Sequence, residues 1–292
     1  MNRNSGRAIS ALFSFAITAL GASAAQAAVK CPEPQASGLP KRVLDVPSGS
    51  EVMARLKKVR GSKRDAEVLD QVLSGNLPTF LRQLAPVNFT GTRANGDAVQ
   101  VTICVTPEYL SVGSDRDFVR VPMGLATAAR IATELGFLLP TPRMVDAIYG
   151  QARVRLAPRP MKPTSQMEST AYLLEHDRTL DAQRAQKGQG LSELAAGQKK
   201  DIVLTNRLRS KPGRVAIYGW HRPNGKPIQP LSTVHGAAYA DYSHGVRLVS
   251  RVAFVDGIER DLAEIVQDRD LAHLVSSEGP IADAAQLLAK QY

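Results

Sequence analysis

The spacing of apolar residues changes period along this chain, and the order of these changes limits the folds that it can adopt. Helical spacing over residues 48–84, broken at Gly61, predicts two helices. The period then falls to two, and Asn95-Gly96 can form a tight hairpin turn because both residues tolerate positive φ. The alternating segments predict an antiparallel β meander whose strands cover residues 87–92, 98–105, 109–112 and 118–121.

Helical spacing returns in the middle of the chain. Its first stretch stops at Gly136, a residue suited to a left-handed C-terminal cap. Thr141-Pro142 is typical of an N-cap followed by proline at the first helical position. Ser165 and Glu168 have the spacing of a capping box. The helices predicted from these signals cover residues 125–135, 141–152 and 165–186.

The C-terminal part of the chain adds strands at residues 201–205, 214–220 and 246–255, and helices at residues 260–275 and 281–290. Helices and antiparallel strands alternate in blocks without a βαβ rhythm, which indicates the α+β class. We expect an antiparallel β meander and a C-terminal set of strands packed with several helices. The length predicts a single α+β domain over residues 28–292, with a possible sub-division at the proline-rich residues 158–163.

The first 27 residues have the pattern of a cleavable secretory signal peptide. Arg3 and Arg7 precede an apolar run at residues 8–21, and Ala25 and Ala27 are small residues of the kind that signal peptidase requires. The run is about fourteen residues long, short of the roughly twenty of a membrane-spanning helix. We therefore expect a mature chain without a transmembrane segment that works in the periplasm or is secreted.

Both cysteines, Cys31 and Cys104, lie in the predicted mature chain. An oxidising compartment allows a disulfide between them. Cys104 could instead be a small buried residue of its predicted strand.

The chain carries a surplus of positive charge. Its formal net charge of +10 falls to +8 when Arg3 and Arg7 leave with the signal peptide. Such a surplus favours anionic partners, here an anionic cell-envelope polymer or a peptide substrate. No recognisable nucleic-acid-binding module accompanies the charge, so nucleic acid is not the expected partner.

Candidate chemistry is concentrated in residues 221–247. Three of the five histidines lie there, in a turn-rich stretch where Gly236 and Gly245 each follow a histidine. Loops that hang from buried strands commonly carry sites, and glycine allows close approach of backbone and substrate. The residues predicted to be catalytic are His235, Asp241, Ser243 and His244. Those predicted to bind substrate are Trp220, Tyr242, Arg247 and Lys200.

One hypothesis for this stretch is a metal site. His221, His235 and His244, with Asp241, would hold a zinc-like ion that activates water. Ser232, His235 and Asp241 also resemble the serine, histidine and aspartate that the metallopeptidases of D-alanyl peptides place before a Trp-His pair. Here the offsets differ by one residue and the Trp-His pair comes first, so the resemblance does not assign the family.

A second resemblance is to the L,D-transpeptidases, which cross-link cell-wall peptides. It covers the six residues Ser243-His244-Gly245-Val246-Arg247-Leu248. The family places its catalytic cysteine directly after the glycine, where this chain has Val246. Without a thiol there is no thiolate nucleophile, so the family's reaction cannot be carried over.

A third hypothesis needs no metal. A histidine acts as general base, Asp241 or another carboxylate orients it, and Ser243 or a water molecule attacks, while Arg247 holds an anionic group of the substrate. The alternatives are a ligand site without catalysis and a purely structural role. In the structural interpretation His235 and His244 are buried and hydrogen-bonded, Asp241 caps a turn, and Arg247 pairs with an acid such as Asp256.

Other residues have a functional and a structural interpretation. Lys199 and Lys200 could grip an anion while Asp201 orients a histidine, or the three could be the polar edge of a strand. Glu168 could cap a helix or serve as an acid. Trp220 could be a platform for a sugar ring or a peptide plane, or a core residue.

The sequence as a whole predicts an exported hydrolase that acts on a cell-envelope polymer, peptidoglycan or a related glycan or peptide, through the histidine-rich loop. Zinc is a possible cofactor of this hydrolase. The alternative is a non-enzymatic envelope protein that binds a glycan or a protein partner through its aromatic side chains and basic surface.

Overall fold

The computed structural model describes Met1 and residues 29–292. The predicted signal peptide, residues 1–27, therefore lies outside the described residues apart from Met1. A five-stranded antiparallel sheet and several smaller sheets, packed with helices, build the described part of the chain, which confirms the predicted α+β class.

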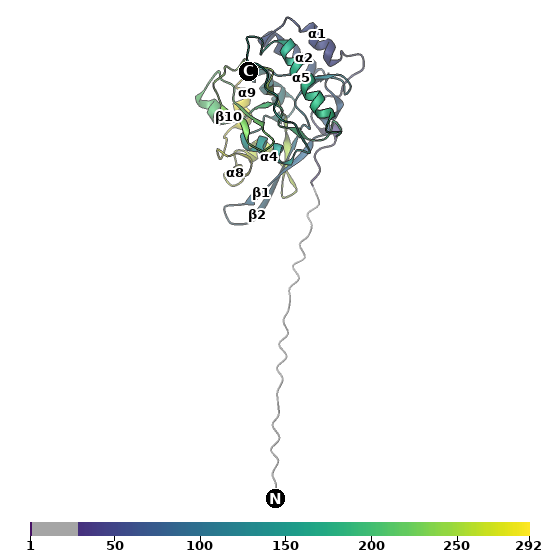
Figure 1. The fold of residues 1–292 in the computed structure, drawn as a ribbon. Coiled ribbons are helices and arrows are strands. Elements are labelled where there is room, and N and C mark those ends of the chain that lie inside the picture. Colours follow the sequence, from purple (N-terminus) through teal and green to yellow (C-terminus); the bar gives the residue numbers. More distant parts are fainter. Residues whose placement is uncertain (2–28) are drawn as a thin grey trace.

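The largest sheet contains five strands and is built on the predicted hairpin. Its strands are β1 (Ala85–Thr92), β2 (Ala98–Val105), β5 (Phe137–Leu138), β12 (Val249–Val255) and β13 (Ile258–Asp261). β1 pairs with β2 along its whole length, and this hairpin projects from the body of the molecule (Figure 1). The order is β1-β2-β12-β13, with β5 paired to β12. A strand from the far end of the chain thus completes the sheet.

The two later strands of the predicted meander form a separate ribbon. β3 (Ser111–Gly113) and β4 (Phe118–Arg120) pair with each other, and β12 takes the position beside β2. The C-terminal half of β2 is buried on both faces. The more apolar β12 fits this position better than the short ribbon does.

The second sheet has four short strands and carries four of the predicted site residues, Lys200, Trp220, His221 and His244. These strands are β8 (Lys200–Ile202), β9 (Ile217–His221), β10 (Pro227–Ser232) and β11 (His244–Gly245), in the order β10-β9-β8-β11. β11 runs parallel to β8, whereas the pairs β8-β9 and β9-β10 are antiparallel. Another parallel pair joins β6 (Val154–Arg155) to β7 (Ala195–Ala196).

The longer helices follow the predicted periodicity. They are α1 (Gly49–Arg55), α2 (Gly61–Leu73), α3 (Leu125–Glu134), α4 (Pro142–Gln151) and α5 (Thr170–Ala185), and short 3-10 helices cover Pro34–Ala36 and Thr79–Arg82. The side chain of Thr141 caps α4, as predicted, by accepting a hydrogen bond from the backbone N–H of Met144. α5 starts later than predicted because Ser169, and not Ser165, accepts from the backbone N–H at its start.

The C-terminal helices are shorter than predicted. They are α6 (Arg207–Ser210), α7 (Leu262–Ile265), α8 (Ala272–Val275) and α9 (Ala284–Ala289). The predicted helix over residues 260–275 is divided, because β13 extends to Asp261, whose side chain caps α7. The carboxylate of Asp268 then accepts from the backbone N–H groups of Asp270 and Leu271 and separates α7 from α8.

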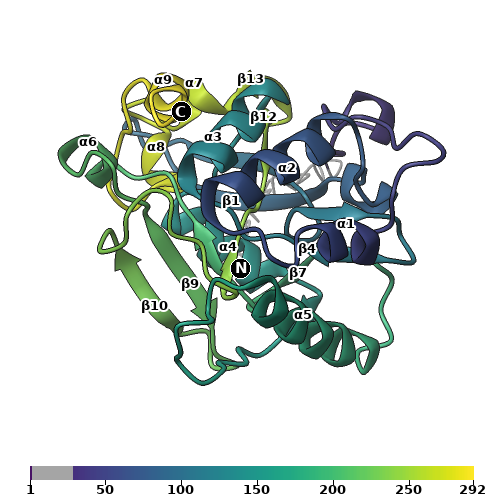
Figure 2. The same cartoon turned by 90° about the horizontal axis from the view of Figure 1, so that it is seen from above.

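Helix α4 connects the two larger sheets, because it packs against both β1 and β9. One cluster of buried apolar side chains extends from Leu39 to Leu288, and a small second cluster contains Val154, Leu156 and Ala195. Figure 2 shows α2 beside α3 on one side of the molecule, with α5 and the β9-β10 hairpin on the other. Within the described residues, no helix has the length and apolar character needed to cross a membrane.

A disulfide joins Cys31 to Cys104, which confirms the pairing that the sequence allowed. Cys104 is also fully buried in β2. The bond therefore ties the start of the described chain to an inner strand of the largest sheet.

Candidate functional site

The free edge of the second sheet brings several predicted site residues together. His244 in β11 pairs with Lys200 in β8, and the backbone N–H of Lys200 donates to the carbonyl of Ser243 at 2.7 Å. On the other side of β8, Lys200 pairs with Gly219, and the N–H of Trp220 donates to the carbonyl of Lys199. Residues that are far apart in the sequence therefore become neighbours through strand pairing.

His244 is the innermost of these side chains. It is fully buried, and neither of its ring nitrogens has a hydrogen-bond partner among the described residues. A neutral imidazole has one N–H donor and one acceptor nitrogen, and buried polar groups in native proteins are almost always bonded to protein or water. A fully buried imidazole with no partner among these residues at either nitrogen is therefore unusual.

Asp241 organises the polar side of the site. Its Oδ1 accepts from the backbone N–H of Ser243 at 2.7 Å and from the Ser243 hydroxyl at 2.5 Å, and its Oδ2 accepts from the Tyr239 hydroxyl at 3.0 Å. Burial raises the pKa of Asp241, but attraction to His244 and the bonds from Ser243 lower it, and the lowering prevails. Asp241 is thus an ionised group with both oxygens engaged.

His235 and Tyr239 form the half-buried part of the site. Their rings are stacked with centroids 4.2 Å apart. The His244 ring lies 6.4 Å from His235 and makes an edge contact with Tyr239 at 5.6 Å. Because His244 is buried while the other two are partly exposed, we infer that the stacked pair covers His244.

Lys200 and Trp220 come from β8 and β9, the next two strands of the same sheet. The Lys200 ammonium lies 5.1 Å from the centre of the Trp220 ring. Trp220 has φ 59, a left-handed conformation that costs a bulky residue about 1–3 kcal/mol, and its buried indole N–H has no acceptor among the described residues. Strain and an unbonded donor in one side chain are features that cluster at functional sites.

The arrangement suits a neutral histidine base. Burial lowers the pKa of His244 to about 4, against the opposing effect of Asp241 and with the assistance of Lys200. The imidazole is therefore neutral at physiological pH and can accept a proton. Ser243 donates its hydroxyl to Asp241, and Asp241 has no hydrogen bond to an imidazole among the described residues, so a Ser-His-Asp relay is not assembled.

His221 lies apart from this group, although the sequence placed it in a shared metal site. Its Nε2 is 2.8 Å from Oδ1 of Asp146, and its ring stacks on Tyr149 at 4.6 Å. Among the described residues, no three His, Cys, Asp or Glu side chains are placed to hold one metal ion. The expected set of His221, His235 and His244 is therefore not brought together, because β9 directs His221 toward α4.

Two predicted substrate-binding residues have structural partners instead. The Tyr242 hydroxyl accepts from the backbone N–H of Met161 at 2.8 Å, and the Tyr242 ring packs against His176. Arg247 is fully buried, donates to the carbonyls of Thr106 and Ala195, and lies over the Tyr109 ring.

These contacts correct two interpretations of Arg247. It does not hold a substrate anion, because carbonyl acceptors and Tyr109 enclose its guanidinium. It is also not paired with the acid that the structural interpretation suggested, since Asp256 is bound by Arg93.

In the run Lys199-Lys200-Asp201, the first and last residues are buried and the middle one is partly exposed. The Lys199 ammonium is buried and donates to the carbonyl of Tyr242 at 2.6 Å, and burial lowers its pKa to about 8. Asp201 accepts from the Tyr109 hydroxyl at 2.9 Å, and burial raises its pKa to about 6. Only Lys200 of the three is partly exposed.

The structure also corrects the predicted role of Glu168 and adds two residues, Asp146 and Tyr239, that the sequence did not predict. Glu168 is not the cap of α5; its backbone carbonyl accepts from the buried Arg64 at 2.7 Å. Asp146 binds His221, but no local signal identified it because it is one polar residue on an ordinary helix face. Tyr239 was not among the predicted site residues, and its bond to Asp241 depends on the turn between them.

Comparisons with known proteins give no assignment: no protein-family model matches the chain, and no curated protein or solved structure matches it significantly.

Proposed function

We propose that the protein is an exported hydrolase of a cell-envelope polymer and that His244 is its general base. The observation that carries this proposal is the fully buried imidazole of His244, whose two nitrogens have no hydrogen-bond partner among the described residues, beside an ionised Asp241. The disulfide between Cys31 and Cys104 supports a periplasmic or secreted location, because such bonds persist in oxidising compartments.

The bond cleaved in this proposal is an amide or ester of a peptide-containing polymer such as peptidoglycan. Glycoside hydrolysis normally uses a pair of carboxylates, whereas the described site offers Asp241 alone. Neutral His244 takes a proton from water while the water oxygen attacks the carbonyl carbon. The imidazolium then returns the proton to the leaving group, which balances the reaction.

Two cationic or N–H donors are available for the negative charge that develops on the carbonyl oxygen. One is the ammonium of Lys200, the strand partner of His244, and the other is the indole N–H of Trp220, whose ring centre lies 5.1 Å from that ammonium. Preorganised donors of this kind stabilise a developing oxyanion because they need no rearrangement during the reaction. The stacked pair of His235 and Tyr239 must move for a substrate to reach His244, which makes this pair the gate of the proposed site.

The test compares His244→Asn with the control His273→Asn, which changes an exposed histidine of α8. We expect His244→Asn to lower kcat/KM for release of peptide from cell-wall fragments by roughly 100-fold or more, the usual contribution of a general base, and the control to leave it unchanged. The wild-type kcat/KM should also fall as pH drops through about 4, where His244 becomes protonated. Equal activity of the two variants, with both folded by thermal unfolding, rules out His244 as the base.

A second candidate function is binding without turnover. A basic hollow away from the histidine cluster favours it, since three cationic side chains line that hollow. Saturable binding of envelope glycan by a protein that releases no product from any cell-wall fraction would support this alternative over hydrolysis.

A further inference from the structure

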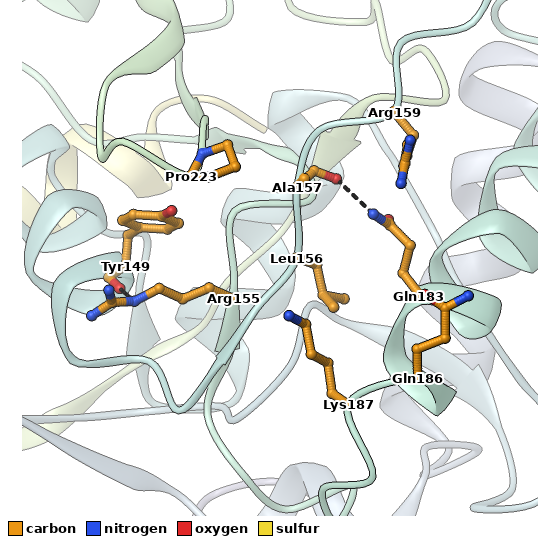
Figure 3. Close-up of a pocket in the computed structure, with 9 residues that line it drawn as sticks. All are labelled: Tyr149, Arg155, Leu156, Ala157, Arg159, Gln183, Gln186, Lys187 and Pro223. Atoms are coloured by element: carbon orange, nitrogen blue, oxygen red, sulfur yellow. Dashed lines mark hydrogen bonds between the residues drawn. The ribbon is translucent and has the colours of Figure 1, made fainter.

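A hollow of about 320 Å³ lies between α5 and the chain that follows α4 (Figure 3). Three of its lining side chains are cationic: Arg155, Arg159 and Lys187. Figure 3 shows Arg159 and Lys187 pointing into the same space from opposite sides, with Gln183 between them. None of these residues belongs to the histidine cluster, so the hollow is a separate feature of the surface.

The positive charge in this hollow is not neutralised by neighbouring acids. No Asp or Glu of the described residues lines it. The nearby acids have other partners, because Asp181 is bound by Arg120 and Glu193 by Arg153. Arg159 and Lys187 are therefore exposed cations that retain the capacity to bind an anion.

Arg155 gives the hollow a rigid wall. Its guanidinium donates to the carbonyls of Tyr149 and Gly150 at the C-terminal end of α4, and it lies over the Tyr149 ring at 5.3 Å. The other face of that ring stacks on His221. Tyr149 thus fixes Arg155 in place and does not offer a free face to a ligand.

A second hollow of about 450 Å³ adjoins the first along α5. The two share Arg159, Gln183 and Gln186, and the second adds Arg178. Arg178 lies in α5, whereas Lys187 follows the end of this helix at Ala185. The cations therefore extend over two adjoining hollows, with Lys187 in the first, Arg178 in the second and Arg159 in both.

The lining favours a sugar chain over a simple phosphate chain. Ala157 and Pro223 contribute accessible apolar surface to the first hollow beside its cations, while Leu156 beneath them is buried. A sugar ring presents apolar C–H groups as well as hydroxyls, and an acidic sugar adds a carboxylate, so it matches both kinds of surface. A polyphosphate has no apolar surface to place against these side chains.

We infer that the groove along α5, defined by Arg159, Arg178 and Lys187, binds a linear acidic polysaccharide. Its carboxylates lie against the cations, and its rings lie against the apolar wall of the first hollow. This inference goes beyond the proposed hydrolysis and does not depend on it. The connector that carries Arg159 is hydrogen-bonded at Met161 to Tyr242, two residues from His244, so a bound chain would be anchored close to the proposed active site.

The test measures binding of galacturonate oligomers of two and six units to the full mature protein by isothermal titration calorimetry. The variant is Arg159→Gln/Lys187→Gln, and the matched control is Arg116→Gln/Lys57→Gln, which removes the same charge from exposed positions elsewhere. We expect the hexamer to bind more tightly than the dimer, because only the hexamer reaches both hollows. The groove variant should weaken hexamer binding about tenfold and the control less than about twofold.

Three results would overturn the inference. Equal weakening by the control would mean that only net charge matters. Equal affinity for both oligomers would contradict a continuous groove. A polyphosphate of similar length that binds through Arg159 and Lys187 while the hexagalacturonate does not would reject the sugar assignment. Binding of the hexamer by the variant His244→Asn separates the two proposals. Its affinity should equal that of the wild type, whether or not hydrolysis is detected.

Discussion

At the scale of single residues, strands β8 and β11 of the second sheet place two ionisable side chains, Asp201 and His244, in a buried environment. Asp201 in β8 pairs through its backbone with Gly245, the residue after His244. Burial raises the pKa of Asp201 to about 6 and lowers that of His244 to about 4. Both shifts favour the neutral form, which is the expected effect of taking a charge out of water.

The substitution Asp201→Asn tests how much the buried negative charge of Asp201 lowers the free energy of unfolding. The folded pKa of about 6 is above the unfolded value of 3.8, so the folded state loses stability relative to the unfolded state as pH rises between these values. The amide can still accept the Tyr109 hydroxyl without carrying a charge. We therefore expect the variant to gain up to roughly 3 kcal/mol in unfolding free energy over the wild type at about pH 8, and little at about pH 4.

The measurement is urea unfolding of both proteins at the two pH values. Asp70→Asn, at an exposed position of α2, serves as the control and should show no such pH dependence. A variant that is less stable than the wild type at the higher pH would show that the ionised carboxylate is stabilising and that its burial is not the dominant effect.

At the scale of elements, the position of His244 depends on how closely β11 approaches the core. A Cβ atom at Gly245 would lie 2.6 Å from the Tyr109 ring and 2.9 Å from the Cβ of Lys199. The glycine after His244 therefore allows close packing inside the protein. The sequence alone favours a different role for Gly245, which is to leave room for a substrate. Gly236, which follows His235, has nothing within 4 Å of its Cβ position.

The two glycines provide a matched pair of substitutions. Gly245→Ala should destabilise the protein by about 1–3 kcal/mol, because a packed ring and strand must shift, and should displace β11 with His244. Gly236→Ala should change the unfolding free energy by less than about 0.5 kcal/mol. Thermal unfolding checks both values. Equal stability of the two variants would show that β11 can move away from Tyr109 at no cost.

At the scale of the whole molecule, the disulfide between Cys31 and Cys104 closes a loop of 73 residues. In the chain-entropy account, a loop of this size stabilises the folded state by about 4 kcal/mol, because it restricts the unfolded chain. We expect dithiothreitol to lower the melting temperature of the wild type clearly. The Cys31→Ser/Cys104→Ser variant should melt at the temperature of the reduced wild type and should not respond to the reductant. A melting temperature unaffected by both changes would show that the bond adds no stability.

The sequence by itself determined the features that local physics controls. The hairpin around Asn95-Gly96, the cap at Thr141 and the alternation of helical and strand blocks depend on the conformational preferences of a few adjacent residues, and the structure confirms them. The sequence also located the histidine-dense stretch, since composition needs no knowledge of contacts.

Only the tertiary structure decided which members of that stretch meet. Strand pairing brings Lys200 beside His244, while it turns His221 toward Asp146 and buries Arg247 against Tyr109. Adjacent residues of a strand point to opposite faces, and partners on neighbouring strands are set by register, so nearness in the sequence does not predict nearness in space. The chain specifies this register through long-range packing of its core, which no single segment contains.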